Sequence, residues 1–224
     1  MLKHLRVLMG RRSSAAPPTR RAVPLAGYDQ SLKAELRTRP QRTQAAFAAA
    51  CAERQYPAYA AFLQASGRDD DGLVRQGLNC AWEWAATGVT QDPDPADLVA
   101  RCVALISDEE TDDVIPAHAE DAIASVAYAL QAAAGLAEGA AGWAAQRGMD
   151  SLDSFLLSNE IDLSLPAAEQ RVWEHPLVTA EISRREADLR RLDRASDWKA
   201  EVGAVRADAT GLSALPLERL DHTV

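Results

Sequence analysis

Residues 116–134 read PAHAEDAIASVAYALQAAA and form the clearest amphipathic pattern in the chain. Apolar side chains recur there at intervals of three and four residues, at Ile123, Val126, Ala127, Leu130 and Ala134. This spacing places them on one face of an α-helix, because one turn takes 3.6 residues. We therefore expect a long helix that begins at Pro116 and turns its apolar face to the core.

Similar helical signals continue in both directions from this segment. No stretch resembles a β-strand, and a chain rich in Ala and poor in β-branched residues favours helix over sheet. Pro57 is expected to begin a new helix, since proline is well suited to the first helical position. The expected helices cover residues 29–38, 43–55, 57–65, 73–87, 98–106, 116–134, 167–174 and 176–200, with an Ala-rich core segment at 140–157. The sequence thus predicts an all-α fold, a compact bundle of about seven or eight helices.

The charge of the chain is divided unevenly. Its 224 residues carry a net charge of -9, and 47% of them are apolar. Residues 1–45 hold 10 Lys/Arg and 2 Asp/Glu, a net charge of +8, so the remaining residues 46–224 carry -17. An acidic body repels nucleic acid and anionic membranes and attracts basic proteins. We expect a basic protein partner, no nucleic acid and no membrane.

The segment organisation follows from composition. Residues 1–25 mix Arg, Pro and Ser without an apolar period, which indicates a basic, disordered extension without a secretory signal. Residues 26–205 are expected to form a single helical domain, and residues 206–224 a loose C-terminal tail. The three cysteines, Cys51, Cys80 and Cys102, have no paired spacing and are interpreted as reduced thiols of a cytoplasmic protein.

The densest group of polar and aromatic residues is CAERQYPAY at residues 51–59. We interpret it in two ways, as a structural clamp between helices or as a pocket. Adjacent helical residues cannot face each other, so Glu53 and Arg54 need separate partners, such as Glu53 with Arg75 or Arg54 with Glu83. Buried tyrosines at such a junction can hydrogen-bond across it. The candidate residues for clamp or pocket are Glu53, Arg54, Tyr56, Tyr59, Trp82 and Glu83.

Evidence for a metal site or a catalytic group is weak. His118 and Asp121 share a helix face, and His175 could approach them from another helix, so these three are the candidate metal ligands. The chain has no G-x-S-x-G, P-loop, calcium-loop or dinucleotide-binding motif. We therefore predict no catalytic residue and no cofactor.

On residues 176–200, Glu181–Arg185 and Glu186–Arg190 are expected to form i,i+4 ion pairs.

The junction also carries a family resemblance. Phe47, Glu53-Arg54, Tyr56-Pro57, Tyr59 and Phe62, followed by Leu78 and Trp82-Glu83, resemble the start of the bacterial domain-of-unknown-function family 416. Residues 116–130 resemble the central helix of that family, and His175-Pro-Leu-Val, with Glu181 and Leu189, its last helix. The resemblance covers about residues 28–195. It implies a compact, all-α bacterial protein and supplies no catalytic residues.

Two functions are consistent with these observations. The first is a non-enzymatic helical interaction protein with an acidic body suited to a basic partner, in the manner of an immunity protein or antitoxin. The alternative is a ligand- or metal-binding helical protein that uses a pocket at the Glu53, Arg54 and Tyr59 junction, with an enzymatic role left open. Homo-oligomers are compatible with either function.

Overall fold

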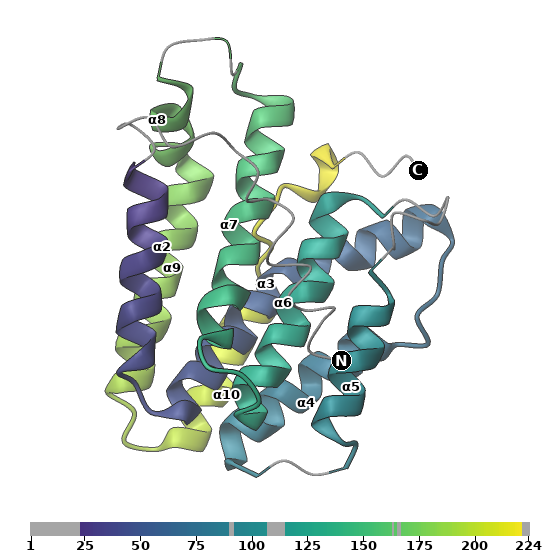
Figure 1. The fold of residues 1–224 in the computed structure, drawn as a ribbon, viewed down its shortest axis with the longest axis vertical. Helices are drawn as coiled ribbons and strands as arrows, with labels where there is room; N and C mark the ends of the chain where they lie inside the picture. The colour runs from purple at the N-terminus through teal and green to yellow at the C-terminus, as the bar shows by residue number, and fades with distance from the viewer. Residues whose placement is uncertain (1–22, 90–91, 107–114, 163, 165–166, 221–224) are drawn as a thin grey trace.

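The computed structural model describes residues 23–89, 92–106, 115–162, 164 and 167–220. The predicted all-α bundle is confirmed for these residues, which contain helices and no strand (Figure 1). The helices are α2 (Val23–Arg37), α3 (Gln41–Ser66), α4 (Leu73–Thr87), α5 (Pro95–Ala104), α6 (Ala117–Ala134), α7 (Ala140–Asn159), α8 (Ala168–Trp173), α9 (Pro176–Asp193) and α10 (Trp198–Thr210), followed by the short 3₁₀ helix η1 (Leu217–Arg219).

Helices α3 and α6 form the centre of the bundle. They pack against each other, and α4 and α7 pack against both of them. Helices α2, α8 and α9 lie on one side of α7, and α5 lies on the far side of the molecule beside α4 and α6 (Figure 1). Every residue from Ala45 to Gln55 of α3 is buried. A helix with no solvent face must be surrounded by other helices, and its many alanines let these neighbours approach closely.

The expected helix boundary at Pro57 is wrong, because α3 runs without interruption from Gln41 to Ser66. A proline inside a helix has no N–H to donate to the carbonyl four residues earlier, here that of Glu53. The neighbouring carbonyl, that of Arg54, accepts a hydrogen bond from the backbone N–H of Ala214 at 2.8 Å. Packing on all sides and this contact from outside the helix hold α3 together where its sequence favours a break.

The C-terminal part of the chain also differs from expectation. The helix expected over residues 176–200 ends at Asp193, and α10 begins at Trp198. The Asp197 side chain accepts the N–H of Ala200 and caps the new helix. Residues 206–220 are packed and not loose: α10 continues to Thr210, and Ala214 and Leu215 are each 4% exposed. Residues 1–22 and 221–224 of the expected extension and tail lie outside the described part of the chain.

Candidate functional site

Arg54 is held by two carboxylates of another helix. Its side chain is 2% exposed, and its Nε and Nη2 lie 3.1 Å from Oε2 and Oε1 of Glu181. Its Nη1 donates to Oδ2 of Asp188 at 2.8 Å. Glu181 and Asp188 are two turns apart on α9 and are themselves buried. The expected partner Glu83 is exposed and makes no contact with Arg54, so that prediction was wrong.

Arg185 extends this cluster toward α7. Its Nε donates to Glu181 Oε1 at 3.0 Å, and its Nη2 donates to the carbonyl of Ala145 at 2.7 Å. The predicted Glu181–Arg185 pair is therefore present, but it lies in the core and not on the surface, since Arg185 is fully buried. Gly148 of α7 makes room for it, because a Cβ there would lie 3.0 Å from Arg185 Nη2 and 3.2 Å from Gln55 Nε2. We call Arg54, Glu181, Arg185 and Asp188 the α3–α9 ion cluster.

Charge pairing and burial oppose each other in the α3–α9 ion cluster. Burial raises the pKa of Glu181, but Arg54 and Arg185 lower it by more, so its pKa falls below the usual 4.5. Burial raises the pKa of Asp188 above 3.8, and Arg54 offsets only part of that effect. Glu181 thus holds its charge in the core because two guanidinium groups face one carboxylate.

Glu53 belongs to a second buried cluster, on the α4 side of α3. Its carboxylate is 1% exposed and accepts hydrogen bonds from Arg75 Nη1 at 2.7 Å and Trp82 Nε1 at 2.8 Å. The guanidinium carbon of Arg75 lies 3.7 Å from the centroid of the Tyr56 ring, a cation–π contact. The expected pairing of Glu53 with Arg75 is confirmed. The two neighbours Glu53 and Arg54 therefore connect α3 to opposite partners, α4 and α9.

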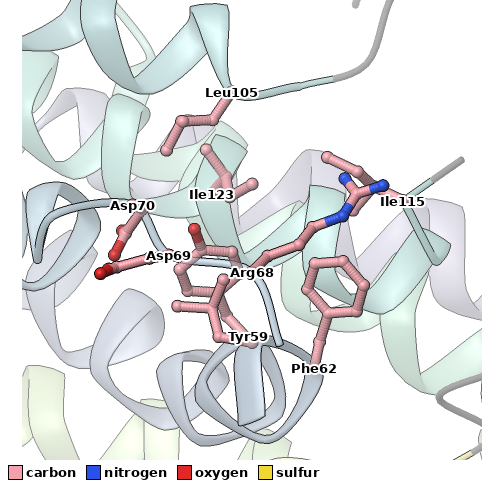
Figure 2. A pocket seen from close by; sticks show the side chains of 9 residues that line it. Tyr59, Phe62, Arg68, Asp69, Asp70, Leu105, Ile115 and Ile123 are labelled. Atoms are coloured by element: carbon pink, nitrogen blue, oxygen red, sulfur yellow. The ribbon is translucent and has the colours of Figure 1, made fainter. Parts of the chain in front are cut away.

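Tyr59, the remaining candidate, lines a pocket at the end of α3. The pocket has a volume of about 280 Å³, with Phe62, Leu105 and Ile123 among its apolar walls and Asp69 and Asp70 among its polar ones (Figure 2). Burial and the neighbouring Asp70 carboxylate raise the pKa of Tyr59, so this phenol stays protonated and can donate a hydrogen bond.

The candidate metal ligands are placed in separate contacts. Asp121 accepts from Arg147 Nη1 at 3.1 Å and Ser151 Oγ at 3.0 Å, which ties α6 to α7. His175 caps α9, with its Nδ1 accepting the N–H of Leu177 and its Nε2 3.0 Å from Glu160 Oε2. His118 is half-buried in the first turn of α6. Within the described ranges, no three His, Cys, Asp or Glu residues are grouped so that they could hold a metal ion.

Three comparisons place the chain among known proteins. A family model described as "Protein of unknown function (DUF416)" matches residues 31–212. The crystal structure of a DUF416 family protein from Shewanella baltica OS155 is similar in fold, with a TM-score of 0.69 and 17% sequence identity over 81% of this chain and 95% of that one. No curated protein sequence matches. Because the family model spans most of the chain, including both buried clusters, this chain belongs to the DUF416 family of proteins of unknown function.

Proposed function

We propose that this chain is a non-enzymatic binding protein that presents an acidic surface to a basic protein partner. The observation that carries the proposal is an excess of acidic side chains without ion pairs along α4 and its two flanking connections. Six such acids are exposed along α4, its connections and the first turn of α5: Asp69, Asp71, Glu83, Asp92, Asp94 and Asp97. We call them the α4 acidic surface. Among the ion pairs between described residues, none includes a member of this set.

The lack of neutralising charge follows from the clusters described above. Arg75 is the one basic residue between positions 69 and 97, and its guanidinium is paired with the buried carboxylate of Glu53. Several acids outside this segment are paired. Arg191 pairs with both Glu201 and Asp208, and Arg39 pairs with Asp193. Along residues 69–97, in contrast, six exposed acids take part in no ion pair between described residues.

A surface of one sign attracts an oppositely charged partner and speeds its association, which suits a protein that blocks a basic toxin domain. An inhibitor of the immunity or antitoxin type is the specific form of the proposal. The alternative function is a ligand site at the Glu53, Arg54 and Tyr59 junction. There Glu53 and Arg54 are held in buried ion pairs, and Tyr59 lines the pocket described above. No helix in the described part of the chain is long and apolar enough to cross a membrane.

The proposal is tested by retention of partners from a lysate of the source organism at low and high salt. The test variant neutralises part of the α4 acidic surface with Asp69→Asn, Asp71→Asn, Glu83→Gln and Asp97→Asn. The matched control neutralises four exposed acids elsewhere, Glu138, Glu169, Glu174 and Glu218, each to Gln. We expect the unmodified chain and the control to retain the same basic protein at low salt, and the test variant to lose it. Equal retention by both variants, or no basic protein retained at all, would refute the proposal.

A further inference from the structure

The pocket beside Tyr59 has a volume and a distribution of charged groups that suit a single side chain. Its volume of about 280 Å³ lies just below the range of roughly 300–1,000 Å³ typical of sites for whole small molecules. Phe62, Leu105 and Ile123 give it apolar walls from three different helices or their ends. Such walls favour a slender hydrocarbon chain.

The two carboxylates of the pocket lie together at one side. Figure 2 shows the carboxylates of Asp69 and Asp70 next to each other, away from the Phe62 ring. Both oxygens of Asp70 are held by backbone donors, with Oδ1 3.1 Å from Gly72 N and Oδ2 2.9 Å from Val74 N. Asp69 is exposed and accepts the N–H of Asp71 at 2.9 Å. Each carboxylate has about four acceptor positions, so both can also accept a hydrogen bond from a ligand.

The chain itself places a basic side chain against one of these walls, the Phe62 ring. The guanidinium carbon of Arg68 lies 5.6 Å from the centroid of the Phe62 ring. In Figure 2 this side chain runs away from Asp69 and Asp70 and ends beside Ile115. Its charge is thus placed at the opposite side of the pocket from the two carboxylates. Long basic side chains commonly lay an aliphatic stem along apolar surface and keep the charged end at a polar rim.

We propose that this pocket accepts one lysine or arginine side chain of the basic partner, with its stem against Phe62, Leu105 and Ile123 and its charge on Asp69 and Asp70. This inference rests on the proposed function and specifies where the partner is anchored. Asp69 belongs to the α4 acidic surface, so the pocket is continuous with that surface. Exposed acids would attract the partner from a distance, whereas the pocket would fix its position.

The test titrates the full chain with Nα-acetyl-arginine amide and with the neutral analogue Nα-acetyl-citrulline amide. The readout is the chemical shift of the methyl groups of Leu105, Ile115 and Ile123. We expect the arginine probe to shift these methyls in a saturable way and the citrulline probe to bind about 10-fold more weakly, since a charge-assisted hydrogen bond contributes that much. Asp69→Asn should weaken the arginine probe about 10-fold, and Glu83→Gln, the matched control, should not.

Each outcome separates the pocket from the proposed function. Absence of saturable shifts at these methyls, equal binding of both probes, or no effect of Asp69→Asn would overturn the pocket proposal. If the chain still retained a basic protein in the lysate experiment, the proposed function would stand and its anchor would lie elsewhere on the α4 acidic surface. Arginine binding without any retained protein would support the pocket and refute the partner.

Discussion

The guanidinium of Arg54 meets the carboxylate of Glu181 side-on, with Nε 3.1 Å from Oε2 and Nη2 3.1 Å from Oε1. The two residues are 127 positions apart, and each side chain is at most 2% exposed. A buried ion pair of this kind adds little net stability compared with an apolar pair, but loss of one partner leaves an uncompensated charge in the core. The docking of α9 onto α3 therefore depends on both side chains being present together.

Arg54→Met should separate a structural clamp from a binding role. The change leaves Glu181 and Asp188 with fewer positive partners in the core, and we expect a loss of about 3–5 kcal/mol in the free energy of unfolding. The measurement is urea denaturation. The control is Arg190→Met, which breaks the exposed Glu186–Arg190 pair and should change stability by less than about 1 kcal/mol. An Arg54→Met protein as stable as the control would contradict the clamp.

Gly148→Ala should destabilise the protein through the α3–α9 ion cluster. The added Cβ would crowd Arg185 Nη2 and Gln55 Nε2, both of which are fixed by hydrogen bonds, and overpacking of this kind costs about 1–3 kcal/mol. Gly203→Ala on α10 is the matched control. It has no atom within 4 Å of the added Cβ, and alanine in a helix gains about 0.5–1 kcal/mol over glycine. Thermal melts should shift in opposite directions, and parallel shifts would argue against crowding at Gly148.

Glu181 and Asp188 should affect the pH dependence of stability in opposite directions. The folded-state pKa of Glu181 lies below 4.5, so its contribution to stability is present above pH 4.5 and is lost as pH falls through the folded value. The folded-state pKa of Asp188 lies above 3.8, so stability declines as pH rises from 3.8 through that value. Carboxyl ¹³C shifts measure both directly. A titration midpoint for Glu181 above 4.5 would contradict the dominance of Arg54 and Arg185 over burial at that carboxyl. A midpoint for Asp188 below 3.8 would contradict the dominance of burial over Arg54.

Thiol reactivity should distinguish Cys80 from the other cysteines. Burial raises the pKa of Cys51 to about 11 and that of Cys102 to about 12, whereas Cys80 on α4 is half-buried. Because the thiolate is the reactive form, we expect a disulfide reagent at pH 8 to label one thiol in the folded protein and three after unfolding. A Cys80→Ser variant should show no labelling while folded. Fast labelling of that variant would mean that the core around Cys51 or Cys102 opens readily.

The sequence predicted most helices well because their apolar periods and glycine stops are local signals. It failed at Pro57, where the hydrogen bond from Ala214 and packing on all sides override the preference of proline. It also missed the start of α10, although Ser196-Asp197 before Trp198 is a capping signal that could have marked it. A local sequence signal does not decide whether a helix breaks at a given residue, because contacts with other helices can override it.

The candidate site was predicted in part for a similar reason. Glu53 and Arg75 were paired correctly, since both lie near one junction in the sequence. The partners of Arg54 were missed because charged residues on α9 are ordinarily assigned to the surface, and nothing local shows that Glu181, Arg185 and Asp188 are buried. The pocket beside Tyr59 joins residues from four parts of the chain, and no spacing in the sequence reveals it.

The distance in sequence between Arg54 and Glu181 also affects folding during synthesis. A ribosome adds roughly 5–20 residues per second, so the 127 positions between them take roughly 6–25 s to synthesise. During that time Arg54 of α3 has no access to Glu181 and Asp188, the carboxylates that pair with it in the folded chain. The N-terminal helices alone therefore cannot supply the carboxylates that neutralise this buried guanidinium, which come only with α9.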